Sequence, residues 1–288
     1  MKPTENILIT GGNGFIGRHL IEYLQTKHYR VIHPDSQELD VRTEADFDSF
    51  CGTDISHVIH LAGRTFVPAS WENPKNFFEV NVMGTLQVIE FCRRYGINLT
   101  YISACIYGQP KSIPVSETSD VKPDNPYAKS KYMAEELCEF YSSFFSMNIS
   151  VLRLFNVYGP GQNENFLIPA IMRQLCSDSA KIEVNDLNPR RDYIYIEDVC
   201  NAIELSIEKS KGFQLYNIGS GVSFSVQEII DLLQKLAGTH KQTVSRNMVR
   251  RNELNDVTAD ISCIKENWKW EPFISLEEGL RRCLLAEK

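Results

Sequence analysis

The sequence TGGNGFIG fills positions 10–17, between the short apolar run Ile7-Leu8-Ile9 and an amphipathic segment that extends to about Lys27. This order predicts a strand over residues 6–10, then a tight turn and a helix. In the spacing G-x-x-G-x-x-G, the first glycine allows the turn, the second lets the backbone approach a pyrophosphate, and the third lets the helix pack closely on the sheet. The amide groups that open the helix then face the anion. We therefore expect a dinucleotide site whose contacts include Gly11, Gly14, Phe15, Ile16 and Gly17.

Short apolar runs alternate with helical patterns through the first half of the chain. Further strands are expected at residues 29–33, 38–41, 57–62, 99–103 and 150–155. Helical periodicity lies between them, at residues 76–95 and 127–145. Strands that alternate with helices predict parallel βαβ units with right-handed crossovers. The expected fold class is α/β, a Rossmann-type doubly wound parallel sheet.

The alternation becomes looser after Gly159, where prolines interrupt the chain. A helix is expected over residues 225–237, a turn at residues 268–272, and a last helix from Leu276. We divide the chain into an NAD-binding Rossmann domain, residues 1–158, and a smaller C-terminal α/β substrate-binding region, residues 159–288. Part of residues 191–220 is expected to return to the Rossmann domain.

Composition excludes several classes of protein. The net charge of −7 argues against a general nucleic-acid binder, and no apolar run approaches the roughly 18 residues of a membrane span. The N-terminal apolar run is too short for a signal peptide. The eight cysteines form no CxxC pair and the six histidines are scattered, which favours reduced thiols in a cytosolic protein over a zinc site or a disulfide framework. We expect a cytoplasmic protein with no metal, nucleic-acid or membrane partner.

An acidic residue follows the second predicted strand. Asp35 can accept hydrogen bonds from the adenosine ribose and repel a 2′-phosphate, which favours NAD over NADP as cofactor. NADP stays possible, because Pro34 and Ser36 leave the loop geometry open and a solvated turn aspartate is the alternative. Asp40 and Val41 are expected at the adenine, where Asp40 can reach the amino group.

Three Tyr-x-x-x-Lys pairs occur, namely Tyr23/Lys27, Tyr107/Lys111 and Tyr127/Lys131. The first lies on the predicted first helix, behind the phosphate turn. Prolines at 110 and 114 flank the second lysine, so that pair cannot share a helical face. The third pair begins a helix after Asp124-Asn125-Pro126, which places both side chains on one face. The preceding strand ends at Ser103, at the sheet edge where open α/β folds bind ligands.

Proton transfer explains these residue types. Oxidation of an alcohol needs a base near neutral pH, whereas free tyrosine titrates at about 10. The ammonium of Lys131 and a cationic nicotinamide both favour the phenolate of Tyr127, so we expect a lowered pKa. Ser103 can hydrogen-bond the substrate oxygen, and in reduction Tyr127 acts as the acid. A tyrosine that merely packs in a core helix is the alternative.

Several long motifs, in order, resemble the extended short-chain dehydrogenase/reductase family of nucleotide-sugar epimerases, dehydratases and 4-keto-reductases. The resemblance runs nearly end to end. Its motifs are TGGNGFIG (10–17), HLAG (60–63), NVMGT (81–85), SACIYG (103–108), PYAKSK (126–131), LRLFNVYGPGQ (152–162), RDYIYIEDV (191–199), YNIGSG (216–221) and SLEEGL (275–280).

The resemblance implies roles for particular residues. Ser103, Tyr127 and Lys131 would form the catalytic triad, the last two also contacting the cofactor. Further cofactor contacts would be Leu61, Ala62, Gly63 and Asn81, the last near the nicotinamide ribose. The substrate, a nucleoside-diphosphate sugar, would meet Ala104, Cys105, Asn156, Asn165, Arg191 and Arg250, with Arg251 as a rival to Arg250. The two arginines would clamp the diphosphate, a role that suits a guanidinium, with surface salt bridges as the alternative. The family also implies a homodimer built from the helices at residues 76–95 and 127–145.

Departures from the family pattern narrow the reaction. Dehydratases of the family carry an Asp-Glu pair where this chain has Ala104 and Cys105, so dehydration is not expected. Cys105 matches a cysteine that the GDP-fucose synthase branch uses in epimerisation, but the accompanying histidine is missing, so we interpret Cys105 as pocket lining. The chain length is closer to that of the 4-keto-reductases, whereas Asp35 favours the NAD-retaining epimerases.

The leading hypothesis is hydride transfer at sugar C4, by reduction of a nucleoside-diphosphate 4-keto-6-deoxy sugar. The alternative is a nucleotide-sugar 4-epimerase that retains its NAD. A more remote alternative is a non-catalytic NAD-binding regulatory protein of the same fold, against which the intact triad argues.

Overall fold

A six-stranded parallel sheet forms the centre of the molecule in a computed structural model that describes residues 5–50, 52–248 and 254–286. The strand order is β2-β1-β3-β4-β5-β9. The strands are β1 (Asn6–Thr10), β2 (Arg30–Ile32), β3 (Ile55–His60), β4 (Asn98–Ala104), β5 (Ile149–Leu154) and β9 (Phe213–Ile218). The predicted Rossmann-type, doubly wound α/β fold is confirmed.

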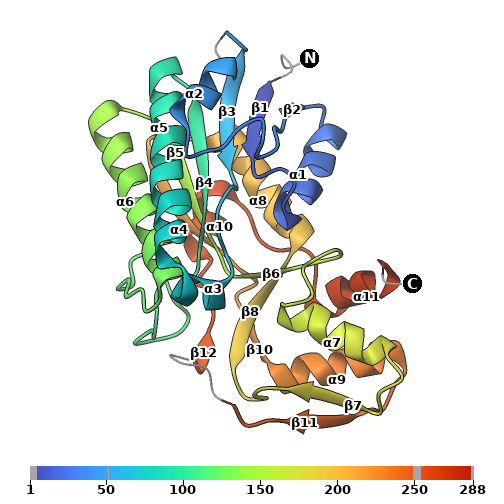
Figure 1. The fold of residues 1–288 in the computed structure, drawn as a ribbon. Helices are drawn as coiled ribbons and strands as arrows, with labels where there is room; N and C mark the ends of the chain where they lie inside the picture. The colour runs from blue at the N-terminus through green and yellow to red at the C-terminus, as the bar shows by residue number, and fades with distance from the viewer. Residues whose placement is uncertain (1–4, 51, 249–253, 287–288) are drawn as a thin grey trace.

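Helices cover both faces of this sheet (Figure 1). α1 (Phe15–Thr26) and α8 (Ile196–Lys209) lie on one face, and α5 (Gly84–Tyr95) and α6 (Pro126–Phe145) lie on the other. Ile7 and Ile9 pack with the first pair of helices, and Leu8 between them packs with the second. Alternate residues of one strand thus enter opposite cores, which explains why the strands read as uninterrupted apolar runs.

The strand predicted at residues 38–41 is wrong. The chain turns there instead, because the Asp35 carboxylate accepts hydrogen bonds from the backbone N–H groups of Gln37 (2.7 Å) and Glu38 (3.0 Å). The N–H of Leu39 also donates to the Asp35 carbonyl, at 2.9 Å. These local bonds compete successfully with a sheet ladder. Two short elements follow, α2 (Glu44–Phe47) and η1 (Asp48–Phe50).

The helix predicted at residues 76–95 is present, but it is not uniform. α4 (Pro74–Phe78) passes into a π-helical turn, η2 (Glu79–Met83), and then into α5. The Asn73 side chain caps the start of α4 by accepting a bond from the N–H of Asn76. Short π-helical turns inside helices are common at functional sites, and Asn81 is at the centre of this one.

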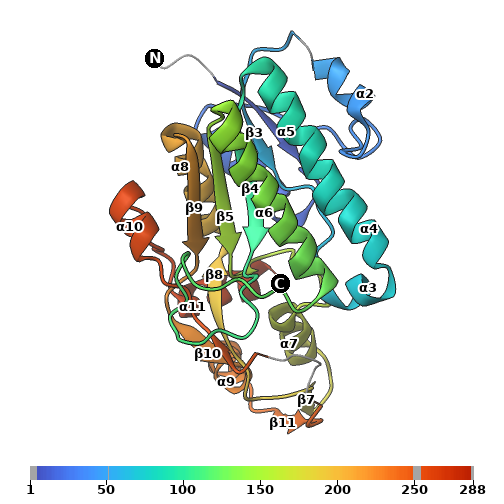
Figure 2. The same ribbon diagram turned by 90° about the vertical axis from the view of Figure 1, so that its left-hand side faces the viewer.

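The C-terminal region lies beyond the carboxyl ends of the central strands (Figures 1 and 2). Its core is a small sheet of order β10-β8-β12, with β6 also paired to β8, and β7 pairs with β11. The remaining elements are α3 (Val67–Glu72), β6 (Asn156–Tyr158), α7 (Leu167–Cys176), β7 (Lys181–Val184), β8 (Arg190–Tyr195), β10 (Ser223–Ser225), α9 (Val226–Ala237), β11 (Gln242–Ser245), β12 (Asp256–Val257), α10 (Ser262–Trp268) and α11 (Leu276–Ala286).

The predicted helices of this region correspond to α9 and α11. α9 begins with a capping box in which Ser225 and Glu228 each bond the other's backbone N–H, as a helix N-terminus favours. The turn predicted at residues 268–272 starts at Lys269, which has a φ of 58° at the end of α10. β9 lies in the central sheet although its sequence is in the second half of the chain. The boundary at residue 158 itself stays a prediction.

The order in which the strands are added to the sheet reverses at β1, because β2 lies on one side of β1 and β3 lies on the other. Open α/β sheets bind ligands at such a point, beyond the carboxyl ends of the two strands between which the order changes. The glycine turn follows β1, and residues 61–64 follow β3. The predicted site residues therefore surround one edge of the sheet. None of the helices in the described residues is both long and apolar enough to span a membrane.

Candidate active site

The glycine turn after β1 is built so that backbone, and not side chains, borders the edge of the sheet. Gly11 has a φ of 75°, and a Cβ atom there would lie 2.6 Å from the backbone nitrogen of Ala62. A Cβ atom on Gly17 would lie 2.5 Å from the carbonyl oxygens of both Gly11 and Gly12. The N–H of Gly14 donates to the Gly11 carbonyl at 3.0 Å, which closes the turn. A bare turn before a helix N-terminus fits a pyrophosphate.

A buried histidine outside the set of predicted site residues connects this turn to its neighbours. His60 Nδ1 lies 2.6 Å from Thr10 Oγ1, and His60 Nε2 lies 3.0 Å from Thr85 Oγ1. Thr85 in turn donates to the carbonyl of Asn81 at 2.6 Å. Burial lowers the pKa of His60 to about 3, so the ring is neutral. The ends of β1 and β3 are thereby fixed to the start of α5.

Asn81 joins the loop after β3 to α6. Its Oδ1 accepts from the N–H of Arg64 at 2.8 Å, and its Nδ2 donates to the Arg64 carbonyl at 3.0 Å and to Ser130 Oγ at 2.9 Å. A Cβ atom on Gly63 would be 3.1 Å from Asn81 Oδ1 and 3.8 Å from Lys131 Nζ. The Asn81 side chain thus positions the backbone of residues 63 and 64 beside Lys131. Its predicted contact with the cofactor ribose stays a prediction.

Three predicted catalytic residues come from β4 and α6. Asn125 caps α6 by accepting a bond from the N–H of Ala128 at 2.8 Å, which starts the helix just before Tyr127. Lys131 lies one turn further along, is buried, and donates from Nζ to the Ile102 carbonyl at 2.6 Å. Ser103 is buried, and its Oγ has no hydrogen-bond partner among the described residues. A buried hydroxyl without a partner is uncommon and is suited to a ligand oxygen.

Burial is the main cause of the shifted pKa values of Tyr127 and Lys131. It raises the pKa of Tyr127 well above its usual value, with a smaller contribution from Cys105. In the chain without cofactor the pKa of Tyr127 is thus raised and not lowered, because burial of the hydroxyl dominates. The expected lowering in the presence of a cationic nicotinamide stays a prediction. Burial also lowers the pKa of Lys131 to about 8, against the charge of Glu135. Lys131 is thus still predominantly protonated at neutral pH.

The other two Tyr-x-x-x-Lys pairs lie elsewhere, as predicted. The hydroxyl of Tyr23 donates to Glu204 on α8 at 2.7 Å, and the ammonium of Lys27 lies over the Tyr23 ring. Lys111 forms an exposed ion pair with Asp120 at 2.7 Å, and no helix carries it. Tyr107 is buried beside β5, where its hydroxyl has structural partners.

The carboxylates predicted at the adenosine already have local partners. Asp35 Oδ1 accepts hydrogen bonds from two backbone N–H groups of its own turn. The carboxylate therefore stabilises this turn, which is the alternative role considered for it. Arg42 donates to both oxygens of Asp40 and lowers the pKa of that carboxyl. Val41 is buried against Gly84, where a Cβ atom would lie 2.8 Å from Val41 Cγ2.

The residues around the glycine turn are also held in place. Phe15 packs edge-on against His19, whose Nε2 lies 2.8 Å from the Pro160 carbonyl. Ile16 is partly buried in the core beneath α1, as is Leu61, whose N–H donates to the Thr10 carbonyl at 3.1 Å.

Four predicted substrate contacts differ in their surroundings. Ala104 ends β4 beside Leu154, and Cys105 follows it. Burial raises the pKa of Cys105 to about 12, with the charge of Arg191 opposing this, so the thiol stays neutral and suits pocket lining. Asn156 opens β6 and donates to the Asp192 carbonyl at 3.2 Å. Asn165 is exposed in the loop before α7.

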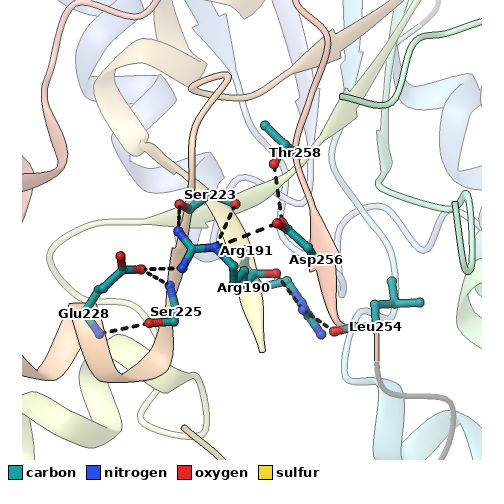
Figure 3. Close-up of polar contacts among 8 residues, drawn as sticks. All are labelled: Arg190, Arg191, Ser223, Ser225, Glu228, Leu254, Asp256 and Thr258. Carbon is teal, nitrogen blue, oxygen red and sulfur yellow. Dashed lines mark hydrogen bonds and ion pairs between the residues drawn. The ribbon is translucent and has the colours of Figure 1, made fainter. Parts of the chain in front are cut away.

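Two consecutive arginines on β8 point in different directions (Figure 3). Arg190 donates to the Ser223 carbonyl at 2.7 Å and pairs with Glu228 at 2.8 Å. Arg191 NH1 donates at 2.7 Å to its neighbour's carbonyl and at 2.7 Å to that of Leu254. Adjacent residues of a strand face opposite sides, so only Arg191 lies on the side of Cys105. The other predicted clamp, Arg250, and its rival Arg251 are outside the described residues.

Together these features fit a dinucleotide and a polar second ligand. The glycine turn offers backbone to a pyrophosphate, and the unpartnered Ser103 hydroxyl offers a hydrogen bond next to Ile102, whose carbonyl accepts from Lys131. Among the described residues, no group of three or more His, Cys, Asp or Glu side chains is placed to hold a metal ion.

Comparison with known proteins gives one consistent family. The model of the NAD dependent epimerase/dehydratase family matches residues 7–219. The chain is 30% identical to GDP-6-deoxy-D-mannose reductase of Pseudomonas aeruginosa, over 98% of this chain and 96% of that protein. It is 33% identical to GDP-6-deoxy-D-talose 4-dehydrogenase of Aggregatibacter actinomycetemcomitans, over 89% of this chain and 88% of that protein.

Two solved structures resemble it over 98% of both chains. RMD from Pseudomonas aeruginosa in complex with NADPH has a TM-score of 0.91 and 29% identity. UDP-glucose 4-epimerase from Thermotoga maritima with UDP-glucose has a TM-score of 0.92 and 30% identity.

The position of Tyr127 predicts the effect of removing its hydroxyl. Tyr127→Phe should fold normally and lower kcat roughly a hundredfold or more, the usual scale for loss of a general acid–base group. The control is Tyr23→Phe, which removes a hydroxyl on the far face of the sheet and should turn over nearly as the wild type. Equal kcat values for both variants in a steady-state assay would exclude Tyr127 as the proton carrier.

Proposed function

Because the chain belongs to the NAD-dependent epimerase/dehydratase family, we propose that it is a nucleotide-sugar oxidoreductase that transfers a hydride at sugar C4. The favoured reaction is reduction of a nucleoside-diphosphate 4-keto-6-deoxy sugar. The observation that carries the proposal is the meeting of Ser103, Tyr127 and Lys131 at the carboxyl end of β4, beside the glycine turn.

Each catalytic residue has a role that follows from its surroundings. Tyr127 donates the proton to the C4 oxygen during reduction and removes it during oxidation, and Ser103 hydrogen-bonds the same oxygen. Lys131, charged and fixed on the Ile102 carbonyl, stabilises the phenolate after the proton has left. A nicotinamide dinucleotide bound here would supply or accept the hydride. It would be held by the glycine turn, residues 61–63 and the Tyr127–Lys131 pair.

NAD is the favoured cofactor and NADP the alternative. Asp35 supports NAD, because its carboxylate is at the end of β2 and would repel a 2′-phosphate. The relative RMD, however, is described with NADPH, and the Thermus thermophilus UDP-glucose 4-epimerase with NAD. Both cofactors therefore enter the test below.

The second candidate function is 4-epimerisation. A putative UDP-glucose 4-epimerase of Methanocaldococcus jannaschii is 30% identical over 96% of both chains, which favours it. Dehydration is not proposed, since Ala104 and Cys105 provide no acid and Cys105 is a neutral thiol.

The substrate diphosphate is proposed to bind Arg191. Its guanidinium is half-buried on β8 and close enough to Cys105 to affect the pKa of that thiol. Partial burial strengthens a charge-assisted bond to phosphate. Arg250 is proposed as the second arginine on the basis of the sequence alone.

We also propose a homodimer in which α5 and α6 of two copies pack together. The end of α6 exposes an aromatic patch, Phe140, Phe144 and Phe145, whose side chains are 49%, 73% and 47% exposed. Phe140 and Phe144 pack with ring centroids 4.7 Å apart, and Arg93 of α5 lies over Phe145. Exposed apolar patches on adjacent helices are typical of protein interfaces.

A cytoplasmic location without membrane or nucleic-acid partners completes the proposal. Seven of the eight cysteines are among the described residues, and all seven are free thiols, which suits a reducing compartment. The net charge of −7 is unfavourable for binding a phosphate backbone.

An absorbance assay should distinguish the two reactions. Purified protein is given a nucleoside-diphosphate 4-keto-6-deoxy sugar with NADH or with NADPH, and in parallel UDP-glucose without added cofactor. We expect stoichiometric oxidation of the reduced cofactor with the keto sugar. Conversion of UDP-glucose to UDP-galactose with NAD retained on the protein would instead establish the epimerase. If neither of the two reactions occurs, the proposed function is contradicted.

Replacing the clamp should weaken substrate but not cofactor binding. A charge-assisted hydrogen bond contributes about 1.5–3 kcal/mol, so Arg191→Ala should weaken nucleoside-diphosphate binding roughly tenfold to a hundredfold. Calorimetry with UDP, GDP, CDP and dTDP measures this, and NAD affinity should not change. The matched control is Arg190→Ala, whose side chain faces Ser223 and Glu228. Equal effects of the two substitutions would remove Arg191 from the substrate site.

One charge in the aromatic patch should separate the dimer. Phe144→Glu puts a carboxylate on the most exposed phenylalanine of α6, whereas the control Leu285→Glu changes another strongly exposed apolar side chain, on α11. Light scattering at micromolar concentration should find dimers for the wild type and the control, and monomers for Phe144→Glu. A monomeric wild type would contradict the proposed dimer.

A further inference from the structure

A buried ion pair lies directly behind the catalytic residues. Arg153 of β5 donates from Nε to both carboxylate oxygens of Glu135 on α6, at 3.0 and 3.1 Å, and from NH2 to Oε2 at 2.6 Å. Both side chains are only 4% exposed. The three bonds occupy both oxygens of the carboxylate, so its position is fixed by the guanidinium.

The guanidinium is itself fixed from the other side. Arg153 NH1 donates to the hydroxyl of Tyr107 at 2.9 Å, and that hydroxyl donates to Asn217 Oδ1 at 2.6 Å. Ser103, Arg153 and Asn217 are register partners on β4, β5 and β9. In a parallel sheet such partners share a face, so a polar row crosses the sheet beneath α6 and begins at the catalytic serine.

Glu135 stands in a regular spacing with the catalytic pair. Tyr127, Lys131 and Glu135 are each four residues apart on α6, so they follow one another along one side of the helix. The structure does not pair Lys131 with Glu135. The ammonium donates instead to the Ile102 carbonyl, while the carboxylate is bonded to Arg153. The two charges therefore act on each other through space.

Apart from the Arg153–Glu135 pair, four ionisable side chains near Lys131 carry no charge near neutral pH. His60 of β3 is neutral, since burial lowers its pKa to about 3. Burial raises the pKa values of Tyr101 on β4, and of Tyr127 and Cys138 on α6, well above neutrality. The charge of Glu135 raises the pKa of Lys131 against the effect of burial, with a smaller contribution from Cys138.

We propose that Glu135 and Arg153 are positioning residues for the reaction: the carboxylate keeps Lys131 charged in its buried place, and the guanidinium holds that carboxylate away from a closed pair with the ammonium. Lys131 then stays on the Ile102 carbonyl, one turn from Tyr127. This inference rests on the proposed function, in which Lys131 stabilises the phenolate of Tyr127.

The titration of Lys131 tests the proposal without any substrate. Protein labelled with ¹³C at lysine Cε is titrated by NMR, and the signal lost in Lys131→Arg is assigned to Lys131. Glu135→Gln should lower the pKa of Lys131 by about one pH unit or more, the usual effect of a close opposite charge. Arg153→Met should raise it, because the freed carboxylate can then approach the ammonium.

The double variant Glu135→Gln/Arg153→Met makes the test independent of the folding of either single variant, since it leaves no unpaired buried charge. Its Lys131 pKa should lie below that of the wild type and above that of Glu135→Gln. Glu139→Gln is the matched control, because it removes the same charge from the exposed side of the same helix. It should leave the titration unchanged. An unchanged Lys131 titration in the double variant would overturn the proposal.

Turnover provides the second readout. The alkaline limb of the kcat–pH profile should move down in Glu135→Gln by the same number of pH units as the NMR titration, with KM nearly constant. A purely structural role would lower kcat without moving the limb, and would overturn the proposal. A wild type that does not turn over any nucleotide sugar, yet shows the expected Lys131 shifts, would count against the proposed function alone.

Discussion

The close approach of two backbones at the edge of the sheet is the constraint on which the site depends. β1 and β3 end so near each other that residue 11 has no room for a Cβ atom, which would lie 2.6 Å from the nitrogen of Ala62. The approach is maintained by neutral His60, which bridges Thr10 and Thr85. Because the loop after β3 is fixed by this contact, Asn81 can hold it against α6, and Lys131 obtains a defined position. A larger residue at 11 would therefore disturb the position of Lys131 as well as the glycine turn.

Buried polar groups on the α6 side of the sheet fix the orientation of side chains more than they stabilise the fold. Removing Arg153 and Glu135 from water costs free energy that their attraction largely offsets, so such pairs contribute little to the net free energy of folding. Each partner is instead held by several bonds, which leaves a single arrangement in a region where burial strongly shifts proton affinities. The same principle applies to Asp192, whose carboxylate accepts from Ser220, Gly221 and Ala259 and fixes the turn after β9.

The order of elements and the placement of Tyr127 and Lys131 on one helix could be predicted from the sequence because both depend on local periodicity. Apolar runs give strands, and a spacing of four residues after a cap places Tyr127 and Lys131 on one helical face. Residues 38–41 misled this reasoning, since the Asp35 side chain binds its own backbone and leaves no strand there. Long-range partners were not accessible either, as with Arg191 and the carbonyl of Leu254, which are 63 residues apart. A signal for Arg153 was present, because an arginine within the apolar strand sequence LRLF must find a buried partner.

The π-helical turn at Glu79–Met83 has a consequence for how this helix can vary in evolution. A π turn holds one residue more than the α-helical turn it replaces, and each residue of an α-helix advances by about 100°. In a regular α-helix, the apolar residues before and after this turn would therefore lie on different sides. Both Phe77 and Ile89 are nevertheless buried. Deleting a single residue here would restore a regular α-helix and keep the flanking apolar residues on one face, because the π turn already absorbs the extra residue. The turn that presents Asn81 would be lost, however, and with it the alignment of the Asn81 amide with Arg64 and Ser130, so the extra residue serves this amide and not the packing of the helix.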